Sequence, residues 1–186
     1  MQKLVWLRDV VLSGCLLTLG TIAHKLPPAG LFPYFVKFAH SNFDPSVTWK
    51  DIEWIRARWK GSLIIKGVMD EEDARLAADV GAQSVVVSNH GGRQLDSVSS
   101  SIAALPAIAT AVGDRVDVLI DGGIRSGLDV IKAVALGAKG CLLGRAWAYP
   151  LAANGEAGVK SMLRTMHSEI RVAMALSGAT SISEIK

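Results

Sequence analysis

A short apolar run that ends in a histidine-arginine turn constrains this chain more than any other feature. The run is Ser84-Val85-Val86-Val87, and the turn after it reads Ser88-Asn89-His90-Gly91-Gly92-Arg93-Gln94-Leu95-Asp96. Such a run predicts a buried strand of a parallel sheet, and parallel α/β folds place their chemistry at the carboxyl ends of these strands. An imidazole can move a proton near neutral pH, and a guanidinium can bind a carboxylate through two hydrogen bonds. The turn therefore predicts a base and an anion-binding group that act on one small acid.

Each charged group also has an ordinary structural explanation. His90 could be a hydrogen-bonded structural histidine and Arg93 could pair with Asp96, but their closeness in one turn favours a functional role. Lys66 lies near the end of an earlier apolar strand, Leu63 to Val68, where its charge could stabilise an anionic ring system. Taken alone, Lys66 is better explained as a lysine that extends from a strand end into water.

From Thr48 onward the sequence alternates between helix and strand patterns. The predicted strands are 63–68, 84–88, 116–120 and 141–143; the predicted helices are 48–61, 70–81, one with Pro106 near its start and Gly113 at its end, 126–136, and 156–177. Ser126 and Asp129 have the spacing of a capping box, as do Thr48 and Asp51. This alternation predicts an α/β fold with a parallel sheet.

The same helix-ending pattern occurs twice along the chain. A helix, a Gly-Ala pair and a strand follow one another at Gly81-Ala82 and again at Gly137-Ala138. The units have the length of βα repeats.

Two further strand ends carry glycine beside arginine. Strand 116–120 runs into Asp121-Gly122-Gly123-Ile124-Arg125, and strand 141–143 runs into Gly144-Arg145. Glycine lets an anion approach the backbone closely, free N–H groups at a helix start point toward it, and arginine neutralises it. In (β/α)₈ barrels the last two such loops form the common phosphate site. Two consecutive turns of this kind predict phosphate binding, although either alone is more often only a tight turn.

Composition limits the partners that the chain can have. The 186 residues suffice for one domain, and residues 1–60 hold eight Lys/Arg against four Asp/Glu. The sequence has no nucleic-acid-binding motif. The basic residues therefore form either an ordinary solvated face or a surface that binds an anionic membrane. Cys15 and Cys141 lack metal-ligand spacing, so we expect no metal site and a reducing compartment. The uncharged stretch from Val10 to Ala23 is too short to span a bilayer.

Four motifs in this order resemble one known family. They are IIKGV, VSNHGGRQLD, DGGIRSGLDVIKAVALGA and LLGRAW. Together they resemble the FMN-dependent α-hydroxy-acid oxidases and dehydrogenases, with the greatest likeness to the bacterial lactate dehydrogenase branch. The resemblance implies a TIM (β/α)₈ barrel, of which this chain carries the C-terminal half: strands 5–8, their helices and a C-terminal helix.

The resemblance also assigns roles to the residues singled out above. His90 matches the catalytic base, and Arg93 matches the arginine that holds the substrate carboxylate. The positions that match FMN contacts are Lys66, Ser88, Asp121, Gly122, Gly123, Ile124, Arg125, Gly144 and Arg145. The implied reaction removes a proton from a small L-2-hydroxy acid, most naturally L-lactate, while two electrons pass to the flavin and a 2-oxo acid forms. Quinone and oxygen both stay open as electron acceptors.

The family pattern is only half present. Counterparts of the first four strands, of the aspartate that orients the base and of the active-site tyrosines are missing from this sequence. We expect the chain alone to be inactive or nearly so, and to expose two long apolar sheet edges. The alternative function is a non-catalytic fragment, or a phosphate-binding half barrel that must pair with another chain. A complete assembly would be a homo-oligomer of the family type.

Residues 1–45 do not follow the alternation, and we separate them from the half barrel over 46–186. They combine basic residues with Trp6, Phe32, Phe35 and Phe38, and prolines interrupt them. Basic and aromatic side chains together favour a membrane interface. By resemblance this is the membrane-docking segment, which predicts a location on the cytoplasmic side of the inner membrane.

Overall fold

The computed structural model describes residues 37–38, 41–42 and 44–185. The chain forms two compact units, Met1–Asp51 and Ile52–Lys186. Most of the segment 1–45, and with it the expected docking surface, lies outside the described residues, as does Cys15. The second unit contains all four strands of the described residues.

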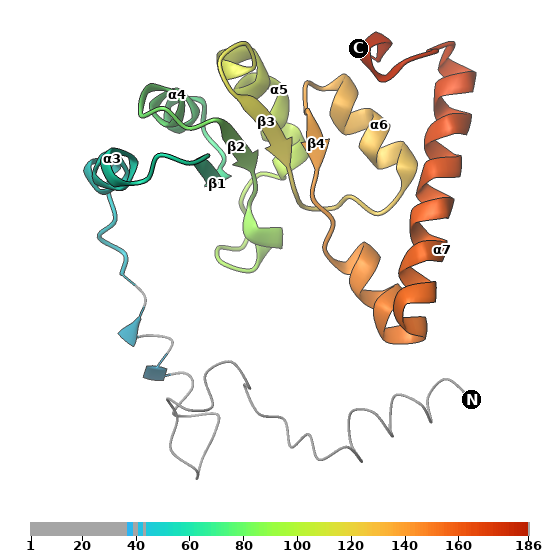
Figure 1. The fold of residues 1–186 in the computed structure, drawn as a ribbon, viewed down its shortest axis with the longest axis horizontal. Coiled ribbons are helices and arrows are strands. Elements are labelled where there is room, and N and C mark those ends of the chain that lie inside the picture. Colours follow the sequence, from blue (N-terminus) through green and yellow to red (C-terminus); the bar gives the residue numbers. More distant parts are fainter. Residues whose placement is uncertain (1–36, 39–40, 43, 186) are drawn as a thin grey trace. The chain divides into compact units, whose positions relative to one another are not determined.

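Helices and strands alternate through this unit (Figure 1). The strands are β1 (Ile64–Val68), β2 (Ser84–Val87), β3 (Asp117–Ile120) and β4 (Gly140–Cys141). The helices are α3 (Trp49–Arg58), α4 (Glu71–Asp79), α5 (Ser101–Val112), α6 (Gly127–Ala135) and α7 (Arg145–Ser177), with 3-10 turns at His90–Gly92 and Ile182–Glu184.

The four strands form one parallel sheet in the order β1-β2-β3-β4. Each crossover steps in the same direction, so right-handed connections place α4, α5 and α6 on the same face. The contacts agree: α4 packs on β1 and β2, α5 on β2 and β3, and α6 on β4. The carboxyl ends of β2 and β3 point downward in Figure 1, toward the loop that carries His90 and the first turns of α7. The topology therefore brings the predicted site residues to one end of the sheet.

The repeated Gly-Ala pairs are matching helix terminations. After α4, the Ala82 N–H donates to the Ala77 carbonyl (3.0 Å), and after α6 the Ala138 N–H donates to the Ala133 carbonyl (3.0 Å). The glycine before each alanine has positive φ, 84° at Gly81 and 103° at Gly137. This is the Schellman motif, which turns the chain back toward the sheet.

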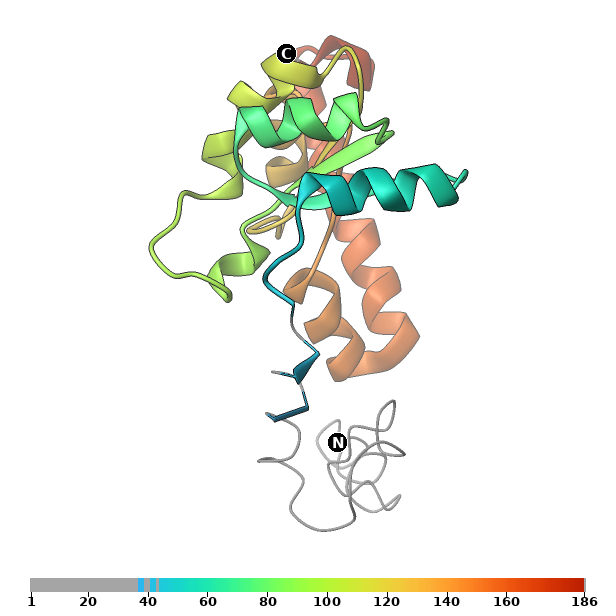
Figure 2. The same cartoon turned by 90° about the vertical axis from the view of Figure 1, so that its left-hand side faces the viewer.

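Three boundaries differ from those that the sequence predicts. Helix α5 begins at Ser101, so Pro106 is its sixth residue and not a first-turn proline. Helix α7 begins at Arg145, directly after Gly144, and a break at Asn154 and Gly155 separates its first segment from the predicted helix 156–177. Figure 2 shows the two segments as separate helices. Strand β4 is only two residues long, so the expected long apolar edge is short on that side.

The amphipathic pattern of the first helix does not become a buried face. The capping contact of α3 is present, since the Thr48 N–H and hydroxyl both donate to Asp51 Oδ2 (2.7 Å each). No residue of α3 is buried in the structure as described, and Trp54 and Trp59 are each more than half exposed. The predicted helix is present, but its apolar stripe is only partly covered: Trp49 and Ile52 are half-buried, whereas Trp59 is 56% exposed.

The core lies between β2, β3 and the helices that cover them. Its fully buried members include Val85, Val87, Leu105, Ile108 and Ile120. Within the described residues, no helix combines the length and the apolar character that crossing a bilayer requires.

Leu105→Ala should test this core. The side chain is 0% exposed, and truncation removes buried methyl groups and leaves a cavity. We expect the free energy of unfolding to fall by about 3 kcal/mol, measured by urea denaturation. Leu176→Ala is the matched control, because Leu176 is 86% exposed and its truncation should cost less than about 0.5 kcal/mol. Equal losses in both variants would contradict the assigned core.

Candidate active site

The turn after β2 holds His90 in an unusual backbone conformation. His90 has φ 55°, in the left-handed region that few non-glycine residues adopt. Its N–H donates to Ser88 Oγ (3.1 Å). The Asn89 side chain ties the loop together, since Oδ1 accepts from the Gly91 N–H (3.0 Å) and Nδ2 donates to the Ser99 carbonyl (3.2 Å). A strained residue held by several contacts is typical of a functional site.

The Lys66 ammonium is tied to two neighbouring strand ends. Nζ donates to Ser88 Oγ (3.0 Å) and lies 2.8 Å from Asp121 Oδ2. Ser88 is 1% exposed, and its hydroxyl oxygen accepts hydrogen bonds from both Lys66 and the backbone N–H of His90. The Lys66 side chain is 41% exposed, which means that this ion pair sets position more than it adds stability. Among the ion pairs of the described residues, none joins Arg93 to Asp96.

The turn after β3 presents both backbone and carboxylate to the same end of the sheet. A Cβ at Gly122 would lie 2.9 Å from Ser101 Oγ, whereas a Cβ at Gly123 would meet nothing within 4 Å. Gly122 is therefore needed for close packing, and Gly123 leaves open space above the backbone. The Ser101 hydroxyl donates to the Asp121 carbonyl (2.6 Å), and Asp121 Oδ1 is buried without a hydrogen-bond partner in the described structure.

A complete capping box fixes the start of α6 beside this turn. Ser126 Oγ accepts from the Asp129 N–H (3.2 Å), and Asp129 Oδ2 accepts from the N–H groups of Arg125 (3.0 Å) and Ser126 (2.9 Å). Partial burial acts to raise the pKa of Asp129, but these hydrogen bonds outweigh it and hold that pKa below its ordinary value. The stabilisation that this carboxylate gives is therefore present above its ordinary pKa and is lost in acid, below about pH 4.

Ser126→Ala should destabilise the fold by about 1 kcal/mol through loss of this cap. Ser100→Ala is a matched control, because Ser100 occupies the N-cap of α5 without a side-chain capping bond. Urea denaturation near pH 7 should lower the midpoint for the first variant and leave the second close to the parent. Equal urea midpoints for Ser126→Ala and the parent would contradict the capping role given to Ser126 Oγ.

The turn after β4 leads into the first turn of α7. Gly144 is the N-cap, and Arg145 and Ala146 are the first helical residues. A Cβ at Gly144 would meet nothing within 4 Å, so the backbone is accessible. The predicted strand-end turn is thus also a helix N-terminus, which favours anions.

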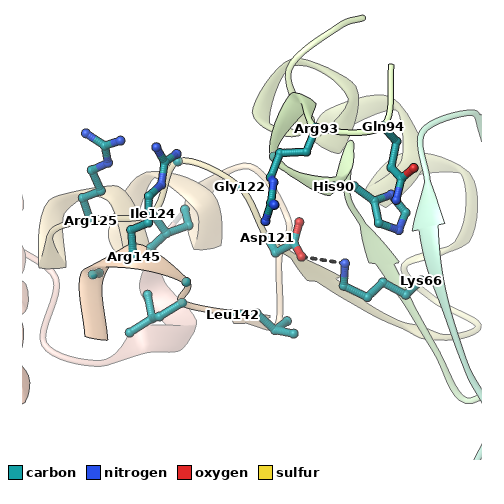
Figure 3. A pocket seen from close by; sticks show the side chains of 15 residues that line it. Lys66, His90, Arg93, Gln94, Asp121, Gly122, Ile124, Arg125, Leu142 and Arg145 are labelled. Carbon is teal, nitrogen blue, oxygen red and sulfur yellow. Dashed lines mark ion pairs between the residues drawn. The ribbon is translucent and has the colours of Figure 1, made fainter. Parts of the chain in front are cut away.

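These elements enclose one pocket of about 840 Å³. It contains ten of the predicted site residues: Lys66, His90, Arg93, Asp121, Gly122, Gly123, Ile124, Arg125, Gly144 and Arg145. Ser88 does not line it, but lies beneath Lys66 and borders an adjacent hollow of about 520 Å³. Figure 3 shows Arg125 and Arg145 at one end and Lys66 and His90 at the other. The pocket holds four cationic side chains and one carboxylate, that of Asp121, and this excess of positive charge favours an anionic ligand. The four are Lys66, Arg93, Arg125 and Arg145.

Five residues around the site were given no role by the sequence patterns. Gln94 lines both hollows, Asn89 closes the histidine loop, and Gly67 lies against the His90 ring. An isolated glycine inside an apolar strand signals a bulge, so Gly67 could have been identified. Leu142 and Leu143 also line the pocket, but their strand pattern gave no sign of it.

Comparison with known proteins places the chain in a family. The family model described as FMN-dependent dehydrogenase matches residues 22–186. The chain belongs to this family.

Individual relatives are similar over nearly the whole chain. An L-lactate dehydrogenase of Caulobacter vibrioides is 57% identical over 183 residues, which are 98% of this chain and 48% of the relative. One of Pseudomonas aeruginosa is 55% identical over 181 residues, 97% of this chain and 47% of the relative. The chain therefore spans about half the length of the curated relatives that it matches.

Solved structures confirm the fold. A mandelate oxidase variant with a monooxide FMN adduct has a TM-score of 0.71 and 47% identity, covering 76% of this chain and 45% of that chain. A mandelate oxidase with (S)-4-hydroxymandelic acid has a TM-score of 0.70 and 47% identity, covering 74% and 39%. The expected architecture, part of a parallel (β/α)₈ barrel, is confirmed.

Proposed function

We propose that this protein serves in the FMN-dependent oxidation of a small L-2-hydroxy acid to the 2-oxo acid, with L-lactate as the first candidate. One observation carries the proposal: a single pocket gathers a histidine, an arginine and a lysine with two glycine-arginine turns. The names of the relatives add the substrate class. We assign His90 as base and Arg93 as the group that binds the substrate carboxylate.

The residues present fit FMN. A phosphate needs cations and free N–H groups, which Arg125, Arg145 and the N-terminus of α7 offer. Asp121 Oδ1 is a buried acceptor whose hydrogen-bonding capacity is unfilled in the described structure, as expected of a contact to a ribityl hydroxyl. When bound, FMN would accept the two electrons that the hydroxy acid gives up.

The side chains of this chain would divide the remaining work. Arg93 binds and orients the carboxylate of the hydroxy acid. His90 removes one of the two protons that the hydroxy acid loses in becoming the 2-oxo acid, and the other would leave with the electron pair that FMN would accept. Lys66, fixed by Ser88 and Asp121, provides positive charge where negative charge develops. Each step is electrostatic or a proton transfer that these groups can perform at neutral pH.

Titration with FMN tests the cofactor, and pyruvate formation from L-lactate with an artificial electron acceptor tests the reaction. We expect the purified chain to bind FMN weakly and to turn over little or no lactate. Substantial lactate oxidation by the 186-residue chain would contradict the need for a second half. A pocket that binds inorganic phosphate but neither FMN nor riboflavin would contradict the proposal itself.

The second candidate is a non-catalytic fragment, or a phosphate-binding half barrel that must pair with another chain. Its support is the half-length match and the two outer strands, since β1 and β4 each pair on one side only among the described residues, with Ile64 51% exposed. Co-expression with the N-terminal half of the Caulobacter relative tests this. Recovery of a complex that oxidises lactate supports pairing, and a complex that binds FMN without turnover supports a non-catalytic role.

We further propose that segment 1–45 attaches the protein to the cytoplasmic side of the inner membrane, with quinone as acceptor and a homo-oligomeric complete assembly. The composition of the segment supports this: basic residues stand beside Trp6, Phe32, Phe35 and Phe38. Sedimentation with anionic vesicles should fall when residues 1–45 are deleted. Unchanged sedimentation would contradict the docking role.

A further inference from the structure

Gly67 forms a bulge in β1, next to Lys66. Lys66 pairs with Val86 and Val68 pairs with Val87, so Gly67 is an extra residue without a partner in β2. Its φ of 100° lies in the left-handed region. Bulges occur beside active sites because they redirect the side chains around them.

Lys66 lies before the bulge, where its side chain follows the normal alternation of a paired strand. Ser88 lies two residues beyond Val86, so the partner of Lys66 and Ser88 share one face of the sheet. Lys66 Nζ accordingly reaches Ser88 Oγ. After the extra residue, Val68 pairs with Val87, and both are buried, at 4% and 0% exposed.

The missing side chain of Gly67 provides the space for the His90 ring. A Cβ at Gly67 would lie 2.9 Å from His90 Cε1, 3.7 Å from Nδ1 and 3.8 Å from Nε2. The first distance is shorter than carbon atoms tolerate, so a side chain there and the present ring position exclude each other. Figure 3 shows the His90 ring close to the strand that carries Lys66. Ser88 holds the backbone N–H of His90. The space left by the absent side chain of Gly67 is where the imidazole of His90 lies.

We propose that Gly67 is a positioning residue that sets the His90 imidazole in the pocket. Any side chain at this position moves the ring away from β1. The consequence for catalysis rests on the proposed function, whereas the position of the ring does not.

The histidine ring signals of the chain test the position directly. With four histidines in the sequence, the ring Cε1–H cross-peaks can be assigned by substitution. We expect a nuclear Overhauser contact between the Gly67 α-protons and His90 Hε1 in the unchanged chain. Gly67→Ala should move the His90 cross-peak more than any other histidine signal. Gly81→Ala is the matched control: φ is 84°, and the added methyl would meet only Arg56 Cδ, at 3.7 Å.

Absence of the Overhauser contact would overturn the inference, and this measurement needs no variant to fold. An unmoved His90 cross-peak in folded Gly67→Ala, or an equal change in Gly81→Ala, would also overturn it. In the assembly completed with the N-terminal half of a relative, Gly67→Ala should lower kcat about 100-fold and leave FMN affinity unchanged. If the completed assembly without any substitution showed no turnover, the proposed function would be contradicted. The histidine ring signals would still test the role of Gly67, because they do not depend on turnover.

Discussion

His90→Gln is expected to lower lactate oxidation by about 10²–10⁴-fold in an assembly completed with the N-terminal half of a relative. Glutamine can hydrogen bond but cannot accept and release a proton near neutral pH, so the base is lost while the loop keeps a polar side chain. The Ser88 contact to the backbone N–H of residue 90 does not depend on the ring. FMN affinity should therefore stay within about twofold, and the loss should appear in kcat. Pyruvate formation at saturating lactate is the measurement.

His167→Gln is the matched control for this prediction. His167 is exposed on α7 and does not line the pocket. Its substitution removes the same titrating group from the surface and should leave turnover unchanged. Comparable turnover in both variants would show that His90 is not the base.

The sequence predicted the elements whose signals are local. The apolar run before Ser88 specifies a buried strand, and Ser126 with Asp129 specifies the start of α6, because each depends on residues a few positions apart. The predicted site followed from one further rule, that parallel strands end at the same edge. Ten of the eleven predicted site residues line one pocket for that reason.

The differences arise where tertiary contacts decide. The start of α5 is fixed by a hydrogen bond from Ser101 to the Asp121 carbonyl, twenty positions away, which places Pro106 inside the helix. The first segment of α7 depends on Gly144 as its N-cap, although no side chain caps it. The contact of Gly67 with His90 needs the register of two paired strands, which the local sequence does not specify.

Replacing both Arg125 and Arg145 with alanine is expected to weaken FMN binding by about 100-fold or more. Hydrogen bonds to a charged group contribute about 1.5–3 kcal/mol each, and each 1.4 kcal/mol corresponds to a factor of ten in affinity. Both arginines lie at the same end of the pocket (Figure 3). Gly123 and Gly144 line the same pocket, and a Cβ at either would meet nothing within 4 Å. Fluorescence titration of the completed assembly with FMN, at several salt concentrations, measures the loss of affinity.

Riboflavin separates phosphate binding from general damage to the pocket, because it lacks the phosphate and keeps the ring and the ribityl chain. The double variant should bind riboflavin as the parent does, since Lys66 and Asp121 are untouched. Arg164→Ala with Arg171→Ala makes the same change in net charge at exposed positions of α7 outside the pocket, and should weaken FMN binding only slightly at low salt. If the Arg125 and Arg145 variant loses FMN and riboflavin to the same extent, the two arginines do not bind the phosphate. Binding of the FMN phosphate at this end of the sheet would then depend on backbone N–H groups alone.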